Sequence, residues 1–497
     1  MTLESFDPTA VRYPATNFVQ GTVLAGDADS YEILRPSDGK LARVEQCASV
    51  ELVDRAIQSA RLAFRKSGWA QRAPRERARV FAKWASLVVE HASELAQLES
   101  VVSPRLYSDA HMWDINNAAE LIRFSAEAAD KLEGQTLATA ADALSMVVRE
   151  PYGVVAGITP FNAPMALAVT KVAPALIAGN ACVIKPSEFT PYSLVRIAQL
   201  GHQAGLPEGL FNVVSGSGGS TGSALIKHPD VDYVSFTGST TAGARVMADA
   251  ALAGVKPVSL ELGGKSPHLV FDDAGDIDTL AEMIVGSCTR NAGQVCFTGS
   301  RLVVHKSLAD RLIERMRAIM VDIRHGPTWD VTSRMGPIMS EAQGRRIEDI
   351  LARATDAGTR VLTGGRRAET PFGGVYFEPT ILLAATSDSP AVREEFFGPV
   401  LTVQTFSEDD EGISLAGHPM FGLAAGIHTK SLERALRAAR SISAGSVWIN
   451  HYGPVPDYNS PFFSPHKQSG LGQEGGMPGV QKYLKSKAIR LKHGFFA

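Results

Sequence analysis

Between residues 151 and 262 the sequence alternates short apolar segments with segments of helical period, and this alternation restricts the fold more than any other feature. The apolar segments include YGVVAGI and NACVI, and each is followed by a stretch in which apolar residues recur every three or four positions. Such a pattern is typical of buried parallel strands connected by helices on both faces of a sheet. We therefore expect an α/β fold with a doubly wound parallel sheet in this region.

A second alternation of the same kind begins near residue 263. A chain of 497 residues is too long for one compact core, so the two regions predict two doubly wound parallel-sheet domains. The segment before them, from residue 49 to about 130, has helical period. Residues 137–151 lose that period and end at Pro151, which predicts an extended arm or a hairpin.

Charge and composition argue against several classes of protein. The net charge is −3 with no acidic or basic tail, so nucleic-acid binding has no electrostatic support. No apolar run approaches the ~20 residues of a membrane span, and the first residues do not resemble a secretion signal. The four cysteines have no CxxC spacing, which favours a reducing cytoplasm over a disulfide framework, and no metal site is expected.

Polar residues follow the strand-like segments of the first region at the point where each segment ends. These residues are Asn162, Lys185, Glu188, Gly238, Ser239 and Glu261. Taken singly, most are explained by a turn or a solvated surface, but burying the carboxylate of Glu261 between Leu260 and Leu262 is costly without a partner or a task. In an open parallel sheet the carboxyl ends of the strands share one edge, where ligands bind. We therefore expect a binding site at this edge.

The stretch FTGSTTAG, residues 236–243, has glycines at 238 and 243 between a strand and a helix. Backbone N–H groups at such a helix N-terminus can contact a pyrophosphate. The motif is not GxGxxG, so a dinucleotide held here would lie differently from one in the usual Rossmann turn.

Cys296 lies in NAGQVCFTGSR, and no histidine occurs within eight residues on either side of it. The thiol is therefore either a packed core residue or a nucleophile whose base comes from another part of the chain.

Seven motifs resemble, in order and spacing, those of the aldehyde dehydrogenase superfamily, and the resemblance extends from about residue 20 to 490. The motifs are PFNAP (160–164), KPSE (185–188), FTGSTTAG (236–243), LELGGKSP (260–267), NAGQVC (291–296), EEFFGPV (394–400) and KQSGLGQEGG (467–476). The resemblance implies oxidation of a small-molecule aldehyde to the free carboxylic acid with NAD(P).

The resemblance also implies a domain organisation and an assembly. The expected parts are a dinucleotide-binding domain from residues 1–130 and 151–262, a catalytic domain from residues 263–455, a loop returning to the cofactor domain at residues 456–482, and an oligomerisation arm from residues 131–150 and 483–497. A homodimer or a homotetramer is expected.

The resemblance implies a role for each catalytic candidate. Cys296 matches the nucleophile that attacks the aldehyde to give a thiohemiacetal, which becomes a thioester when hydride passes to the nicotinamide. Glu261 matches the general base for the hydrolytic water, and Asn162 matches the residue that forms the oxyanion hole with the backbone N–H of Cys296. Lys171 matches a lysine that helps to relay the proton away. The match around Cys296 favours the nucleophile over the packed thiol.

The cofactor implied is NAD, with NADP as an alternative. Lys185 and Glu188 match the clamp on the adenosine ribose, and a carboxylate at Glu188 would repel the 2′-phosphate of NADP. The other expected cofactor contacts are Gly238 and Ser239 at the pyrophosphate, Glu395 and Phe397 at the nicotinamide ribose, and Thr159, Pro160, Phe161, Ser187, Gly218, Phe236 and Leu262.

By position in the motifs, the residues expected to line the aldehyde tunnel are Trp113, Asn117, Leu167, Phe297, Tyr452 and Phe462. Ala163 and Thr170 leave space, and aromatic walls around an enlarged cavity suit an aromatic or bulky apolar aldehyde. If the aromatic residues only pack the tunnel, a semialdehyde or an aliphatic aldehyde is the alternative substrate.

Two other classes of function compete with hydrolytic oxidation. In a CoA-acylating dehydrogenase, coenzyme A rather than water resolves the thioester and the general base is missing, so Glu261 argues against that class. A cysteine esterase or a binding protein that kept the fold is disfavoured because Asn162, Glu261 and Cys296 are all intact.

Overall fold

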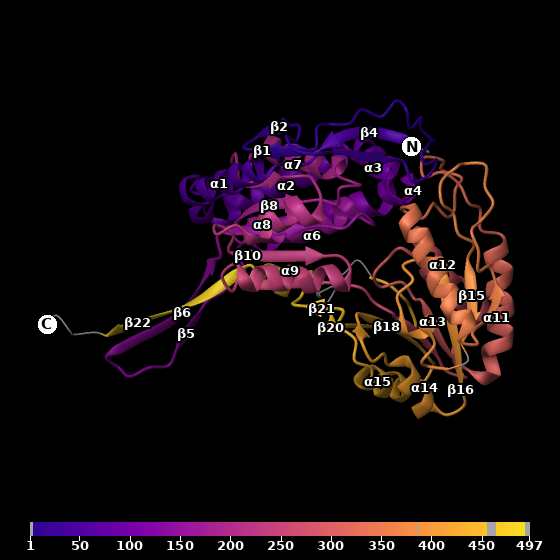
Figure 1. The fold of residues 1–497 in the computed structure, drawn as a ribbon. Helices are drawn as coiled ribbons and strands as arrows, with labels where there is room; N and C mark the ends of the chain where they lie inside the picture. Colours follow the sequence, from indigo (N-terminus) through magenta and orange to yellow (C-terminus); the bar gives the residue numbers. More distant parts are fainter. Residues whose placement is uncertain (1–2, 385, 455–463, 493–497) are drawn as a thin grey trace.

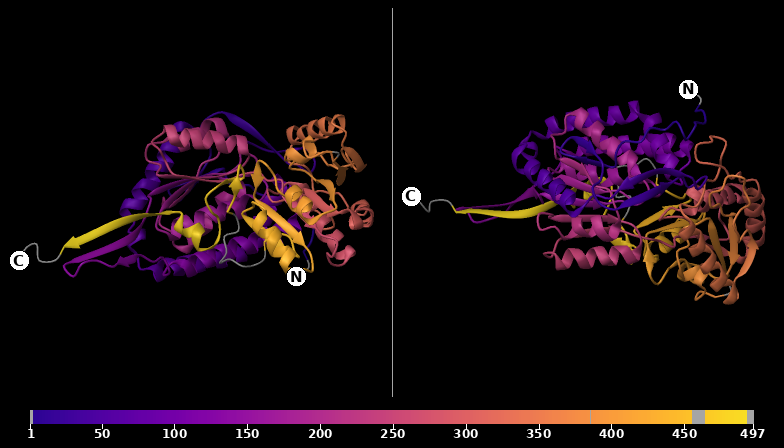
Figure 2. Two further views of the ribbon diagram at one scale, coloured as in Figure 1. Left: turned by 90° about the horizontal axis from the view of Figure 1, so that it is seen from below. Right: turned by 45° about the horizontal axis from the view of Figure 1, so that its top comes forward.

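The computed structural model describes residues 3–384, 386–454 and 464–492. These residues form two α/β domains side by side, and a long antiparallel arm extends away from both and contains the last described residues (Figure 1). The two further views show the same separation of the arm from the domains (Figure 2). The fold class expected from the sequence is confirmed.

The sheet of the first domain is parallel at its centre, in the order β9-β8-β7-β10-β11. These strands are β7 (Val154–Ile158), β8 (Ala181–Lys185), β9 (Phe211–Val213), β10 (Tyr233–Thr237) and β11 (Val258–Glu261). Nearly all of their residues are buried, because helices cover both faces of the sheet. At the β9 edge the sheet continues with the antiparallel strands β1 (Asn17–Val19) and β2 (Thr22–Leu24).

Helices that connect consecutive strands cover the two faces of this sheet. On one face lie α6 (Pro164–Ile177) and α7 (Tyr192–Ala204), backed by α2 (Pro74–Glu90), α3 (Ala92–Val102) and α5 (Ile115–Ala128). On the other face lie α1 (Val50–Lys66), α8 (Ser223–Lys227) and α9 (Thr240–Leu252). The helices begin where the sequence supplies caps; Ser49 accepts from the Leu52 N–H at the start of α1, for example.

The second domain repeats this architecture, with parallel strands in the order β15-β16-β13-β12-β18-β19 and β14 antiparallel at the β15 edge. The strands are β12 (Pro267–Val270), β13 (Arg301–His305), β14 (Arg360–Thr363), β15 (Thr380–Leu383), β16 (Val400–Phe406), β18 (Ala424–His428) and β19 (Ser446–Ile449). One face is covered by α10 (Ile277–Thr289) and α11 (Lys306–Val321), and the other by α14 (Asp409–Ala416) and α15 (Leu432–Ser441). A further core forms around α12 (Glu341–Asp356) and α13 (Pro390–Arg393).

The arm consists of β5 (Gln135–Leu137), β6 (Ala143–Pro151) and β22 (Leu484–Lys492). β22 pairs with β6 along its whole length, from Leu484 opposite Pro151 to Lys492 opposite Ala143. A separate hairpin near the N-terminus is formed by β3 (Ser30–Leu34) and β4 (Leu41–Gln46).

The segment that returns to the first domain is more ordered than the expected loop. Its described part contains β20 (His466–Lys467), β21 (Gly470–Leu471) and α16 (Gly476–Gln481). β20 pairs with β17 (Phe421–Gly422) in the second domain, whereas β21 pairs with β11 in the first. The backbone groups at the edge of β11 attract this pairing, because an edge strand presents unpaired N–H and C=O groups. The chain thereby links the two domains beside Glu261, which lies opposite Gly470.

Candidate active site

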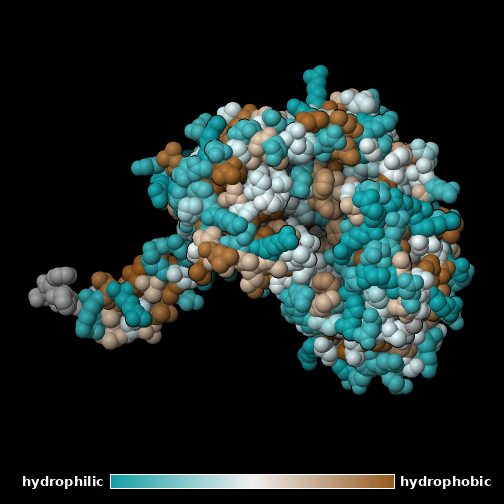
Figure 3. Space-filling view, in the orientation of Figure 1, coloured by the Kyte–Doolittle hydropathy of each residue, from teal (hydrophilic) through white to brown (hydrophobic). Residues whose placement is uncertain are grey.

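The carboxyl ends of the strands in the first sheet face the second domain. The space-filling view shows the surface hollowed between the two domains, with apolar residues at its floor (Figure 3). β7 leads into Asn162 and β11 ends at Glu261, so both side chains are placed by the ends of parallel strands.

The loop before Cys296 is a left-handed turn that joins α10 to the thiol. Asn291 and Ala292 have φ angles of 53° and 51°, and Gly293 follows with a φ of 71°. A left-handed conformation costs about 1–2 kcal/mol for a residue with a side chain, so the surroundings must hold this turn in place. Gly293 is required for a second reason, since a Cβ there would lie 2.1 Å from the carbonyl oxygen of Gly398.

Gln294 holds this turn through both ends of its side-chain amide. Its Nε2 donates to the carbonyls of Asn291 and Pro337 at 3.0 and 3.1 Å, and its Oε1 accepts from the Met339 N–H at 2.9 Å. The residue is fully buried. The sequence prediction assigned no role to Gln294, because its partner in the 337–339 segment is brought near only by folding.

Asn162 connects this loop to the first domain. Its Nδ2 donates to the Gln294 carbonyl at 3.0 Å, and the Nδ2 of Asn291 donates to the Asn162 carbonyl, also at 3.0 Å. A side-chain amide nitrogen carries two hydrogens, so Asn162 keeps a second donor that a substrate oxygen can accept.

The surroundings of Cys296 favour the thiol over the thiolate. Burial raises the pKa of Cys296, and the nearby carboxyl groups of Glu261 and Glu395 raise it further. Because only the thiolate is strongly nucleophilic, this cysteine needs a base or a bound cation before it can attack.

Glu261 is buried at the end of β11, and its Oε1 has no hydrogen-bond partner among the described residues. Burial raises the pKa of Glu261 well above its ordinary value, and the charge of Glu474 adds to this effect, while Lys482 and Lys171 oppose it. A carboxylate with a raised pKa is a stronger base, which is what proton abstraction at neutral pH requires.

A buried cluster of ionised groups lies beside Glu261. The Nζ of Lys171, on α6, is 2.5 Å from Glu474 Oε1, and the Nζ of Lys482 is 3.1 Å from the same oxygen. Thr170 Oγ1 donates to the other oxygen of Glu474 at 3.3 Å. Lys171 was predicted as a site residue, whereas Glu474 and Lys482 were not. The sequence did offer a signal for Glu474, because it is the only acidic residue in the glycine-rich motif KQSGLGQEGG.

The predicted adenosine-ribose residues lie at the carboxyl end of β8, where Lys185 is the last residue of the strand. Lys185 Nζ donates to the Pro186 carbonyl at 2.8 Å and lies 3.4 Å from Glu188 Oε2. Lys185 is buried, whereas the side chain of Glu188 is 37% exposed, so the carboxylate faces outward from the strand end. Ser187 lies between them and accepts from the Phe189 N–H.

The predicted pyrophosphate residues lie at the start of α9. Ser239 caps this helix by accepting from the Ala242 N–H at 3.3 Å. A Cβ on Gly238 would lie 2.5 Å from the ring of Phe236, and a Cβ on Gly243 would lie 2.5 Å from Leu262, so both glycines allow close packing. Gly218 begins the short helix η3 (Gly218–Gly222), and a Cβ there would meet nothing within 4 Å.

The predicted nicotinamide residues approach from the second domain. Glu395 Oε1 accepts from the Gly264 N–H at 3.0 Å, and a Cβ on Gly263 would lie 2.3 Å from Glu395 Oε2. Burial raises the pKa of Glu395 to about 7, although the Gly264 N–H and the charges of Lys265 and Arg346 oppose this.

Phe397, the second predicted nicotinamide residue, has a φ of 50°, and its ring meets that of Phe161 edge to face at 5.9 Å. The remaining predicted contacts, Thr159 and Pro160, follow β7 directly.

Comparison with known proteins decides the family. The sequence model of the aldehyde dehydrogenase family matches residues 23–489. The chain belongs to the aldehyde dehydrogenase family. It is 38% identical to aldehyde dehydrogenase 1 of Tanacetum cinerariifolium over 475 residues, which cover 95% of this chain and 94% of that protein.

Solved structures of aldehyde dehydrogenases have the same fold as this one. An indole-3-acetaldehyde dehydrogenase in complex with NAD+ superposes with a TM-score of 0.94 and 37% identity, over 98% of each chain. The gamma-glutamyl-gamma-aminobutyraldehyde dehydrogenase of Burkholderia cenocepacia gives a TM-score of 0.94 and 36% identity, again over 98% of each chain. None of the helices in the described ranges is long and apolar enough to cross a bilayer.

Aromatic residues of this aldehyde dehydrogenase gather just beyond Cys296. The ring of Phe297 meets that of Trp448 at 5.9 Å, and Trp448 meets Tyr452 at 4.9 Å. Tyr452 is fixed by a hydrogen bond from its hydroxyl to the Phe297 carbonyl at 2.8 Å and by contact with the His268 ring at 4.1 Å. Phe297 and Tyr452 were predicted from the sequence, whereas Trp448 was not.

The other predicted tunnel residues are more dispersed. Leu167 is half-buried on α6, and Asn117 is half-buried on α5. Trp113 is 58% exposed, and the guanidinium of Arg290 lies 5.7 Å from its ring centroid. Phe462 lies outside the described residues. The sequence prediction missed Arg290, which places a cation at this aromatic residue.

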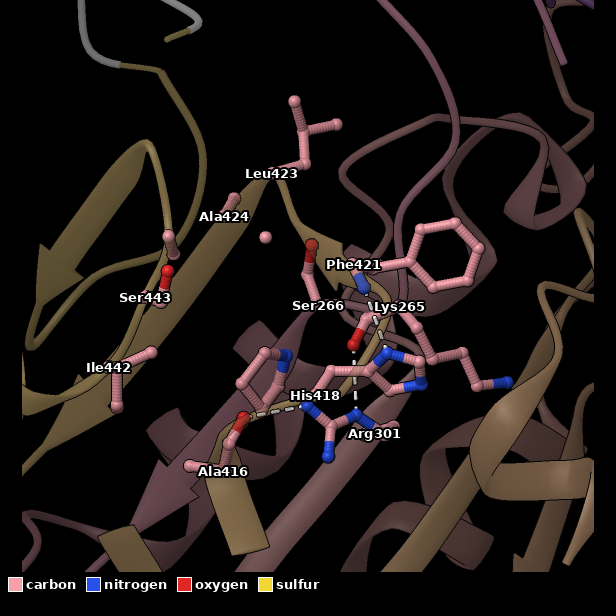
Figure 4. A pocket seen from close by; sticks show the side chains of 13 residues that line it. Lys265, Ser266, Arg301, Ala416, His418, Phe421, Leu423, Ala424, Ile442 and Ser443 are labelled. Atoms are coloured by element: carbon pink, nitrogen blue, oxygen red, sulfur yellow. Dashed lines mark hydrogen bonds between the residues drawn. The ribbon is translucent and has the colours of Figure 1, made fainter. Parts of the chain in front are cut away.

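A narrow pocket on the second domain, between β12, β13 and β18, serves a structural purpose (Figure 4). Arg301 is buried there, and its guanidinium donates to the backbone carbonyls of Lys265, Leu415, Ala416 and Gly417. The side chain of Lys265 runs away from Arg301 (Figure 4), and its Nζ lies 4.5 Å from the ring centroid of Phe396. The described residues include no cluster of His, Cys, Asp or Glu that could hold a metal ion.

The side-chain hydrogen bonds of Gln294 should contribute to the stability of the protein. Gln294→Met leaves the Pro337 carbonyl and the Met339 N–H without partners, which should destabilise the protein by about 2–4 kcal/mol. We expect a melting temperature several degrees lower by calorimetry and a loss of kcat, because the turn before Cys296 loosens. Gln58→Met, at an exposed glutamine of α1, is the matched control. A Gln294→Met protein with the parent's melting temperature would contradict this role of Gln294.

Proposed function

We propose that this aldehyde dehydrogenase oxidises an aromatic or bulky apolar aldehyde to the free carboxylic acid, with Cys296 as nucleophile and NAD as cofactor. One observation carries the proposal. Asn162 donates to the backbone carbonyl two residues before Cys296, and the Glu261 carboxyl is near enough to raise the pKa of the Cys296 thiol.

The proposed chemistry assigns each residue a step. Glu261 accepts the thiol proton, and Cys296 Sγ bonds to the carbonyl carbon while the Asn162 amide donates to the developing oxyanion. Loss of hydride converts this thiohemiacetal on Cys296 to a thioester. Glu261 passes this first proton on and then accepts a proton from the water that cleaves the thioester, so that the acid leaves and Cys296 is regenerated. The cluster of Lys171 and Glu474 offers the proton its next site.

The residues at the strand ends fit NAD. The open surface at Gly218, the capped N-terminus of α9 at Ser239 and the outward carboxylate of Glu188 would hold its adenosine and pyrophosphate, and Glu395 would hold the nicotinamide ribose. When bound, NAD supplies the hydride acceptor. NAD+ is present in the solved indole-3-acetaldehyde dehydrogenase that this chain resembles.

Glu188 should determine the preference for NAD over NADP. Its carboxylate would accept from the ribose hydroxyls of NAD and repel a 2′-phosphate, a repulsion that Lys185 only partly offsets. We expect Glu188→Gln to raise the ratio of kcat/KM with NADP to kcat/KM with NAD by about tenfold. Glu208→Gln, at an exposed glutamate before β9, is the control. A parent enzyme that uses NADP as well as NAD would overturn this assignment.

Cys296 and Glu261 should fail in different ways when substituted. Cys296→Ala should abolish dehydrogenation while NAD still binds, because the cofactor contacts come from other elements. Glu261→Gln removes the base but keeps the size, so we expect a burst of NADH near one per active site. Deacylation should then be ~10²–10⁴-fold slower, the usual loss for a general base.

Two measurements distinguish the effects of these substitutions. Stopped-flow absorbance gives the burst, and mass spectrometry of the peptide that contains Cys296 detects the acyl-enzyme. A shrunken burst that recovers at higher pH would mean that Glu261 also deprotonates the thiol. Near-normal turnover by Cys296→Ala would refute the nucleophile, and parent-like deacylation by Glu261→Gln would refute the base.

The substrate class is proposed from the aromatic residues beyond Cys296. Phe297, Trp448 and Tyr452 form a rigid apolar wall, which suits a flat ring. The similarity to an indole-3-acetaldehyde dehydrogenase supports the same choice. A semialdehyde is the second candidate, because the Arg290 cation at Trp113 could pair with a carboxylate at the far end of such a substrate.

A substrate panel separates these two candidates. We expect phenylacetaldehyde to give a higher kcat/KM than succinic semialdehyde, and Arg290→Leu to leave phenylacetaldehyde oxidation unchanged. If the semialdehyde is instead the better substrate, Arg290→Leu should raise its KM about fivefold, the range of a solvent-exposed ion pair. Arg311→Leu, at an exposed arginine of α11, controls for the change in net charge.

We also propose that the arm joins copies of this chain into a homodimer or homotetramer. Leu137, Ile489 and Leu491 on the arm are 46%, 41% and 53% exposed, and an uncovered sheet with exposed apolar residues favours pairing with another surface. Cys47, Cys182, Cys288 and Cys296 are all free thiols, which supports a reducing compartment such as the cytoplasm.

A further inference from the structure

The cluster beside Glu261 contains more positive charge than the pairing of one carboxylate needs. Glu474 Oε1 contacts two ammonium groups, those of Lys171 at 2.5 Å and Lys482 at 3.1 Å. The side chains of Lys171, Glu474 and Lys482 are 0%, 2% and 9% exposed, so water screens these charges poorly. One lysine would be enough to neutralise the Glu474 carboxylate, so the second lysine needs another explanation.

The returning segment brings groups of this cluster to the strand that ends at Glu261. Glu261 ends β11 and lies opposite Gly470 of β21, and the chain continues from β21 to Glu474. Lys482 directly follows α16, which packs against α6, the helix that carries Lys171. Lys482 is therefore brought to the cluster by the same returning segment that brings Glu474.

Charge balance gives the second lysine a task. With Glu474 and Lys171 ionised, the pair is neutral, and ionisation of Glu261 beside it would leave one uncompensated buried negative charge. An unpaired buried charge is strongly unfavourable. With Lys482 also ionised, the cluster has two negative and two positive groups when Glu261 carries its charge.

We propose that Lys482 is a positioning residue that supplies the second positive charge, and so allows Glu261 to ionise next to the already ionised Glu474. This inference rests on the proposed role of Glu261 as the general base. Lys482 does not touch the substrate; it acts through the electrostatic field at Glu261.

The charged groups that face Glu261 support this assignment. Burial and Glu474 raise the pKa of Glu261, and Lys482 is the first of the groups that lower it, ahead of Lys171. Burial alone would raise the pKa of Glu474, but Lys171 and Lys482 outweigh it and lower that pKa. The other titratable groups near the cluster are the thiol of Cys296 and the hydroxyls of Tyr233 and Tyr483, all of which burial holds neutral.

The pH dependence of deacylation tests the inference. Lys482→Met should raise the pKa of Glu261, so the acid limb of the deacylation rate should move to higher pH by about one unit. At neutral pH the rate should fall about tenfold, and at alkaline pH it should return to the parent value. Lys482→Arg keeps the charge and should retain the parent profile. Lys485→Met removes an exposed cation three residues further on and should leave the profile unchanged.

Other results would overturn the inference or separate its causes. An unshifted acid limb in Lys482→Met refutes the charge role. A uniform loss at every pH with a lower melting temperature, repeated in the milder Lys482→Gln, shows that Lys482 only anchors the returning segment. In the Glu261→Gln background, Lys482→Met should cause no further shift. If Glu261→Gln itself deacylates like the parent, the proposed role of Glu261 as general base is refuted. If Glu261→Gln deacylates slowly but Lys482→Met leaves the acid limb unshifted, only the role of Lys482 is refuted.

Discussion

The hydrogen bonds between Asn162 and the turn before Cys296 are the interaction on which the site depends. Asn162 donates to the carbonyl of Gln294 and accepts from the amide of Asn291, so the end of β7 and the loop after α10 are joined in both directions. All three residues are buried, and an unpaired amide there would be costly. The two domains therefore meet in one arrangement, and the strained left-handed turn is held by contacts from both.

Much of this arrangement could be predicted from the sequence, because a parallel sheet converts sequence position into spatial position. Strands that alternate with helices must run parallel, and the residue after each strand must then lie at one edge. That rule alone places Asn162, Lys185 and Glu261 on one side of the first sheet. Family motifs added Cys296 and Glu395, which come from the second domain and which no strand-end rule connects to the first.

The contacts that the sequence could not reveal depend on folding over long separations. Glu474 and Lys171 are 303 residues apart along the chain and touch only because β21 adds to the edge of β11. Gln294 has backbone partners at 337–339, and backbone partners leave no signature in residue type. The pairing of Arg290 with Trp113 joins two helical segments whose approach depends on the packing of the domains.

The raised pKa of Cys296 has a consequence for the durability of the protein. Peroxides and alkylating agents react with thiolates far faster than with thiols. Burial and two neighbouring carboxyl groups raise the pKa of this sulfur and so favour its less reactive thiol form. The same surroundings that delay the attack on an aldehyde thus also slow accidental oxidation of the sulfur in the absence of substrate.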